Sequence, residues 1–157
     1  MTTQSARYRV NPSEETIELG FVTIRFLVTG GDSQGTVAMF ELLVAAREKL
    51  MPPSHSHDAF EETVYGIEGT LTWTVDGAPI EVAPGQALCI PRGAVHRFDN
   101  EKDEPARALS VISPAVLSPA FFREMAEVTA KAVNSPPDRE RMIAVMLRHG
   151  LTPALPA

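Results

Sequence analysis

Residues 60–82 read Phe-Glu-Glu-Thr-Val-Tyr-Gly-Ile-Glu-Gly-Thr-Leu-Thr-Trp-Thr-Val-Asp-Gly-Ala-Pro-Ile-Glu-Val, and this stretch decides the fold class. Short runs rich in β-branched and aromatic residues, typical of strands, lie at 60–67, 70–75 and 79–82. Asp76-Gly77 separates the second run from the third, and Asp-Gly favours a two-residue hairpin turn. The stretch therefore predicts consecutive strands joined by tight turns.

The same pattern continues on both sides of this stretch. Further strand-like runs lie at 19–28, 36–44, 87–90, 96–98 and 106–112. Turn-forming residues separate them, among them Gly30-Gly31, Pro84-Gly85 and Pro91-Arg92-Gly93. Many short strands with closely spaced turns and no helix between them are typical of a β-sandwich or a β-barrel.

The last part of the chain follows a helical pattern instead. Ser118 and Pro119 suit the start of a helix, since serine caps free amides and proline is favoured at the first helical position. An apolar stripe at helical spacing then follows: Phe121, Met125, Val128 and Ala132. After a break at 134–137, Asp138 can cap a second helix that Gly150 would end.

The length of 157 residues fits one domain, and no repeat or linker divides the chain. We expect an arm at residues 1–17, an all-β barrel at 18–115, and a C-terminal helical tail at 116–157. The tail would pack on the barrel or on a partner subunit.

Charge and hydropathy exclude several classes of protein. The 14 Lys and Arg are scattered among 20 Asp and Glu, with a net charge of −6, so we expect no nucleic-acid partner. No apolar run approaches the ~18–20 residues that span a bilayer. The N-terminus lacks the apolar core of a secretory signal, so we expect no membrane partner and a cytoplasmic location. Cys89 is the only cysteine, and its apolar neighbours predict a buried small hydrophobe.

Three histidines and a carboxylate form the candidate site. His55 and His57 are two residues apart, so on a strand both imidazoles would point to one face. Glu62 follows within the next predicted strand, and His96 comes after a turn. Imidazole with carboxylate suits Mn, Fe, Co, Ni, Cu or Zn better than Ca or Mg.

Other polar and aromatic residues have simpler interpretations. His149 ends the second predicted helix, where a cation complements the helix dipole, and nothing nearby suggests a ligand role. Trp73 and Tyr65 could line a pocket, although large aromatic residues in a barrel more often belong to the core.

With this arrangement of histidines and glutamate, the sequence resembles the cupin family. The first cupin motif fits His55, His57, Glu62 and Gly69. The second motif fits Gly85, Pro91, Gly93, His96 and Asn100. One departure is Lys49, which stands where the family usually has a glycine six positions before the first histidine.

The resemblance implies a double-stranded β-helix, or jelly-roll barrel, with one divalent transition metal ion inside one mouth. Its ligands would be His55, His57, Glu62 and His96. Glu61 is the competing carboxylate, but on a continuous strand it would face outward where Glu62 faces inward. Four ligands on a six-coordinate ion would leave positions for water, substrate or dioxygen.

Among functions, we favour a dioxygenase-type oxidoreductase that acts on a metal-chelating organic substrate, as in quercetin-dioxygenase-like cupins. The alternatives are a non-redox metal-dependent isomerase, cyclase or lyase, and a module that binds a small ligand without turnover. The partner would be a small molecule, and we expect two copies of the chain to form a homodimer through their sheets.

Overall fold

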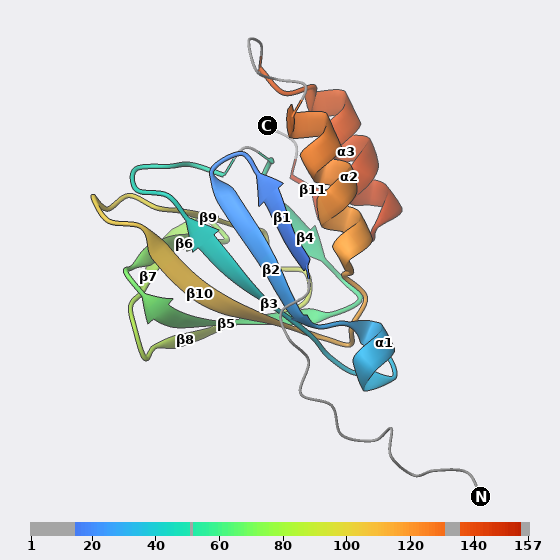
Figure 1. Ribbon diagram of the computed structural model, residues 1–157, viewed down its shortest axis with the longest axis horizontal. Helices are drawn as coiled ribbons and strands as arrows, with labels where there is room; N and C mark the ends of the chain where they lie inside the picture. Colours follow the sequence, from blue (N-terminus) through green and yellow to red (C-terminus); the bar gives the residue numbers. More distant parts are fainter. Residues whose placement is uncertain (1–14, 51, 131–135, 155–157) are drawn as a thin grey trace, which may run out of the picture.

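A computed structural model of the chain describes residues 15–50, 52–130 and 136–154, and within them two antiparallel sheets face each other (Figure 1). In spatial order the larger sheet contains β1 (Glu15–Leu19), β2 (Val22–Val28), β3 (Ala38–Val44), β10 (Ala106–Ser113), β5 (Glu61–Glu68) and β8 (Ala87–Ile90). The smaller sheet contains β11 (Leu151–Pro153), β4 (His55–His57), β9 (His96–Asp99), β6 (Leu71–Val75) and β7 (Ala78–Val82). The helices are α1 (Gly30–Ser33), α2 (Pro119–Ala130) and α3 (Arg139–Arg148).

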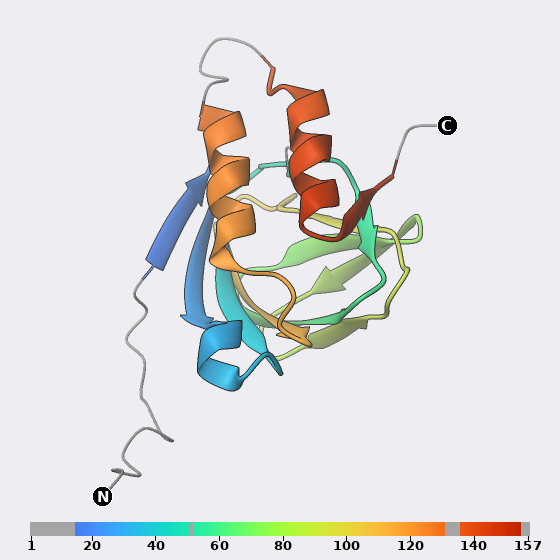
Figure 2. The ribbon, with the colours of Figure 1, turned by 90° about the vertical axis from the view of Figure 1, so that its right-hand side faces the viewer.

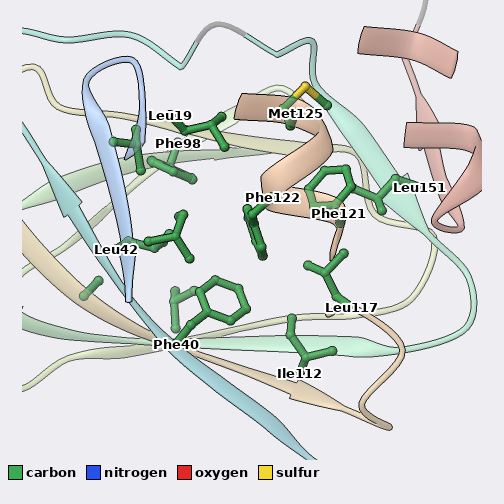
Figure 3. Close-up of a cluster of buried hydrophobic side chains, with 14 of the residues drawn as sticks. Leu19, Phe40, Leu42, Phe98, Ile112, Leu117, Phe121, Phe122, Met125 and Leu151 are labelled. Atoms are coloured by element: carbon green, nitrogen blue, oxygen red, sulfur yellow. The ribbon is translucent and has the colours of Figure 1, made fainter. Parts of the chain in front are cut away.

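The core lies between the two sheets because alternate residues of each strand point inward. Burial alternates along all of β10, for example, with buried residues at 106, 108, 110 and 112. Phe26, Phe40 and Phe122 pack against one another with ring centroids 5.1–5.7 Å apart. Figure 3 shows Phe40 and Leu42 of β3 together with Phe121 and Phe122 of α2 in this cluster, so the tail shares the core of the barrel. The expected jelly-roll barrel with a C-terminal extension is confirmed.

The hairpin predicted at Asp76-Gly77 joins β6 to β7. Both residues have positive φ, 47° for Asp76 and 82° for Gly77, as a two-residue hairpin turn of this kind requires. Val75 pairs with Ala78 directly across the turn. This prediction is confirmed in position and in register.

The strand predicted at 19–28 is wrong in its extent, because the chain turns back within it. Gly20 has a φ of 63°, and Leu19 pairs with Val22 across this turn, so the run is divided between β1 and β2. Residues 15–17 of the expected arm therefore belong to β1, where Ile17 is buried against the barrel. Residues 1–14 of that arm lie outside the described residues.

The tail folds back over the barrel (Figure 2). The helix starts are as predicted: α2 begins at Pro119, and the Asp138 carboxylate accepts a hydrogen bond from the Arg141 amide at the start of α3. The tail also contains a short strand that the sequence did not predict. After Gly150, with a φ of 81°, the chain forms β11, which pairs with β4.

The expectation for Cys89 is also wrong, because this side chain is exposed. β8 is an edge strand, and the buried Ile90 marks its inward face, so the preceding residue points outward. Among the described residues, the structure contains no helix long and apolar enough to cross a membrane.

Candidate metal centre

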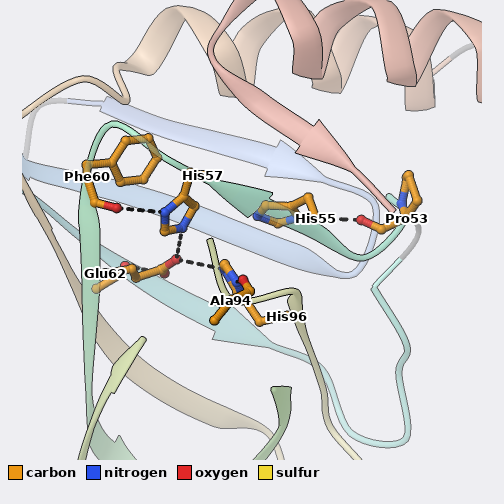
Figure 4. A network of polar contacts seen from close by, with 8 residues as sticks. Pro53, His55, His57, Phe60, Glu62, Ala94 and His96 are labelled. Atoms are coloured by element: carbon orange, nitrogen blue, oxygen red, sulfur yellow. Dashed lines mark hydrogen bonds and ion pairs between the residues drawn. The ribbon is translucent and has the colours of Figure 1, made fainter. Parts of the chain in front are cut away.

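The three candidate histidines come from two neighbouring strands of the smaller sheet. His55 and His57 lie on β4, and His55 pairs directly with His96 of β9. The ring centroid of His96 lies 4.7 Å from that of His55 and 4.8 Å from that of His57. One nitrogen from each ring lies within 4.8 Å of the others, close enough for all three to bind one ion. Figure 4 shows these rings grouped beside Glu62.

Backbone carbonyls set the tautomer of the rings. The Nδ1 atoms of His57 and His96 lie 2.9 Å from the carbonyl oxygens of Phe60 and Ala94. The Nδ1 atom of His55 makes a longer contact, 3.4 Å, with the carbonyl oxygen of Pro53. A carbonyl oxygen only accepts hydrogen bonds, so the Nδ1 atoms of His57 and His96 donate to these carbonyls and the Nε2 atoms face the site.

The environment of the His57 Nε2 atom is compatible with a metal ligand. This atom is buried and has no hydrogen-bond partner among the described residues. A metal ligand commonly has its other ring nitrogen hydrogen-bonded to a backbone carbonyl, as here. Three imidazole nitrogens within 4.8 Å of one another suit a transition-metal ion.

Glu62 supplies the carboxylate of the site. Its Oε1 atom accepts a hydrogen bond of 2.7 Å from the Ser110 hydroxyl. Its Oε2 atom lies 3.3 Å from Nε2 of His96 and 3.4 Å from Nε2 of His57. These contacts place a carboxylate oxygen beside two imidazole nitrogens, so Glu62 fits a fourth donor.

Glu61 faces the other way. Its carboxylate binds the Arg92 guanidinium through contacts of 2.8 and 3.2 Å, and its side chain is 44% exposed. The strand alternation of β5 therefore separates the two neighbouring acids, as the sequence predicted.

Burial and the mutual contacts of the cluster shift the pKa values of three of its members. Burial and the neighbouring His96 lower the pKa of His55 to about 3, so His55 is neutral and free to donate its lone pair. Burial opposes a charge on Glu62, but its contacts with His57 and His96 outweigh burial and hold its pKa below the ordinary value. Burial also opposes a charge on His96, yet the Glu62 carboxylate raises the pKa of His96 overall.

A cavity of about 70 Å³ adjoins the cluster. Its walls are mainly apolar side chains from both sheets and from the tail, including Phe40, Trp73, Phe98, Phe121, Phe122 and Met125. His55, Glu62, His96 and Arg97 also line it. Arg97 donates hydrogen bonds of 2.8 Å to the Leu50 carbonyl and to the Asp99 carboxylate.

Sequence reasoning missed two contributors to this site. Ser110 has a detectable signal, because it is the polar residue on the otherwise apolar inward face of β10. The side chains of Phe121, Phe122 and Met125 were expected on the tail, but their place in the cavity wall follows from the packing of α2.

The two aromatic residues considered for the pocket lie on different faces, and the fourth histidine lies on the tail. Trp73 is 1% exposed and lines the cavity, whereas Tyr65 is 45% exposed on the outer face. His149 lies away from the metal cluster, as expected, with its Nε2 atom 2.9 Å from Glu124 of α2.

Comparison with known proteins supports this description. The family model of the cupin domain matches residues 43–112. Among solved structures, the polyketide cyclase RemF from Streptomyces resistomycificus superposes with a TM-score of 0.55 and 26% sequence identity, over 71% of this chain and 87% of that one.

Two curated relatives are also similar. The tetracenomycin polyketide synthase protein TcmJ from Streptomyces glaucescens is 33% identical over 83 residues, which is 53% of this chain and 56% of that protein. Quercetin 2,3-dioxygenase from Bacillus subtilis is 32% identical over 73 residues, 46% of this chain and 21% of the enzyme. The chain thus spans about half the length of the first relative and about a fifth of the second. The barrel, the motif residues and these matches together support the description of this chain as a small cupin, with quercetin 2,3-dioxygenase among its relatives.

Proposed function

We propose that this chain is a metal-dependent enzyme that cyclises an apolar, carbonyl-rich small molecule without a redox step. One observation carries the proposal: three imidazole lone pairs and the Glu62 carboxylate lie beside a cavity walled by aromatic and aliphatic side chains.

The histidine Nε2 atoms and the Glu62 carboxylate would hold the ion, and the donor set suits Mn, Fe, Co, Ni, Cu or Zn. When bound, the ion supplies a Lewis acid that polarises a substrate carbonyl. The Phe60 and Ala94 carbonyls orient the imidazoles of His57 and His96, and Ser110 holds the carboxylate in place. These contacts keep the donors in position before any ligand arrives.

The cavity supports an apolar substrate. The charge of Arg97 is balanced by Asp99, and the other walls are mainly aromatic and aliphatic. The polyketide proteins RemF and TcmJ, whose names associate them with carbonyl-rich chains, are the relatives that match this character. We therefore favour cyclisation over the dioxygenase reaction that the sequence suggested first.

The cavity is too small for a substrate of several rings unless part of its wall moves. Ligand pockets commonly enclose roughly 300–1,000 Å³, several times the 70 Å³ found here. A substrate of two or more rings must therefore displace part of the wall. The side chains of Phe121, Phe122 and Met125 are the part we expect to move, since they belong to a helix and not to a sheet.

Anaerobic turnover tests the proposal. Zn-loaded protein should convert linear poly-β-carbonyl compounds and aryl β-diketones to ring products that have lost water and gained no oxygen. The metal-free protein and His96→Ala should be inactive in the same assay. Turnover that occurs only with Fe or Mn and dioxygen would overturn the assignment.

The match to quercetin 2,3-dioxygenase favours a second candidate, an oxidoreductase that cleaves a metal-chelating substrate. This alternative predicts oxygen uptake by Fe- or Mn-loaded protein with a flavonol, and ¹⁸O from labelled dioxygen in the product. Zn-loaded protein would then be inactive.

Two further expectations stay predictions. Light scattering at micromolar concentration should show a homodimer, and a monomer would contradict the expected pairing through the sheets. Fractionation of cells that make the protein should find it in the cytoplasm.

A further inference from the structure

Trp73 is the sole tryptophan of the chain and has an unusual environment. Its side chain is 1% exposed, on β6 inside the barrel. Its Nε1 atom is buried and has no hydrogen-bond partner among the described residues. A buried indole N–H ordinarily finds an acceptor, so this donor calls for an explanation.

Strand register places Trp73 next to the candidate metal centre. β6 pairs with β9, with Val75 opposite His96 and Trp73 opposite Phe98. His96 and Phe98 are two residues apart and share the inward face, so Trp73 is a diagonal neighbour of His96, at roughly 7–8 Å. Trp73, His55, Glu62 and His96 line one cavity.

Within residues 15–50, 52–130 and 136–154, no acceptor lies within hydrogen-bond distance of the indole N–H. The neighbouring ring is Phe98, with centroids 4.8 Å apart. The Glu62 oxygens contact Ser110, His57 and His96. Arg97, the other charged residue of the cavity lining, is only a donor. An acceptor for the N–H therefore has to come from whatever occupies the cavity.

We propose that the Trp73 indole N–H donates a hydrogen bond to an oxygen of the substrate. The ligand class is an aromatic or apolar compound with two oxygens, one for the ion beside His96 and a second for Trp73. Trp73 is then a binding residue that orients the substrate and takes no part in proton transfer. This inference rests on the proposed function only in taking the cavity as the substrate site.

Because the chain has one tryptophan, its indole N–H gives one signal in a ¹H–¹⁵N NMR spectrum. The probe is 2-acetyl-1-naphthol, an aryl ketone with an adjacent hydroxyl, added to Zn-loaded protein. The indole proton should move downfield as the probe binds. The ¹³C-labelled methyl of Met125, in the cavity wall, reports occupancy independently.

Replacing the indole nitrogen by sulfur removes the donor and keeps the ring shape. Growth of a tryptophan auxotroph on 3-benzothienylalanine changes Trp73 alone. The Kd for the probe, followed by the Met125 methyl, should rise roughly 5- to 10-fold, as expected for the loss of one hydrogen bond. Tyr65→Phe is the control: it removes a hydroxyl group from the outer face, away from the cavity, and should keep both the Kd and the downfield shift of the indole proton.

Three outcomes would overturn the inference: a Met125 shift with a static indole signal, an unchanged Kd after sulfur replacement, or no binding of the probe. The first two leave the proposed cyclase function intact, because binding is still seen. Conversely, an indole shift without turnover of any tested substrate would reject the proposed function and keep the role of Trp73.

Discussion

Two walls of the same cavity differ in polarity and in the elements that supply them. The histidine wall, made of His55, Glu62 and His96 with His57 next to them, is polar and held by strands and backbone carbonyls. The helical wall, made of Leu117, Phe121, Phe122 and Met125, is apolar and comes from the tail. This contrast indicates that polar contacts within the sheets hold the candidate metal ligands in place. The packing of the tail, by comparison, sets the size of the cavity.

The largest expected effect concerns the histidine wall. His96→Ala removes one of three converging nitrogens, and we expect the affinity for Zn to fall by more than about 100-fold, beyond the loss typical for a residue that only supports a ligand. Competition with a chromophoric chelator measures this. His149→Ala is the matched control, because His149 lies at the end of α3 beside Glu124, and it should bind Zn normally. Unchanged metal content in His96→Ala would reject the site.

The helical wall should respond in stability and not in metal affinity. Met125 is fully buried, so Met125→Ala should lower the free energy of unfolding by about 2–5 kcal/mol in urea titration. Zn affinity should stay within about twofold. Met39→Ala is the control, since Met39 is only half-buried on β3 and should cost less. Loss of Zn binding in Met125→Ala would show that the two walls are coupled.

Substitutions of the two neighbouring glutamates distinguish the loss of a metal ligand from the loss of a surface charge. Glu62→Gln should weaken Zn binding by about 10- to 100-fold, because the amide keeps the shape of the side chain but loses its charge. Glu61→Gln removes the same charge one residue away, where the partner is Arg92 outside the cavity. Titration of both variants with Zn compares them directly. Equal losses would mean that the strand alternation does not select the ligand.

The smallest effect is expected where α2 meets α3. Arg148 and then His149 hold the pKa of Glu124 below its ordinary value, so this carboxylate stabilises the fold above its unfolded-state pKa. That contribution is lost as the pH falls through the lowered pKa. Thermal melts of Glu124→Gln should therefore show a slightly lower Tm than wild type at neutral pH and no difference in acid. A difference that persists in acid would assign the effect to packing.

Much of the histidine wall could be predicted because its signals are local. Two histidines two residues apart on a strand must share a face, and Glu62 and Glu61 must lie on opposite faces. The turn at Asp76-Gly77 was predictable for the same reason, since two residues suffice to define it. These features need no knowledge of distant parts of the chain.

The errors fell where the structure depends on distant contacts. The run at 19–28 looks like one strand until β1 pairs back on β2. The exposure of Cys89 depends on β8 lying at the edge of its sheet. β11 has only three residues, and it forms because β4 offers a free edge for it. Single-chain patterns do not contain these pairings.

The sequence by itself therefore determined the barrel, the candidate residues for a metal site and the existence of two tail helices, because periodicity and spacing act over a few residues. Only the tertiary structure decided that the tail closes the cavity, that Ser110 holds Glu62, and that the Trp73 N–H is buried without a partner among the described residues. These features join segments far apart in the chain, and the packing of side chains, not local preference, brings them together.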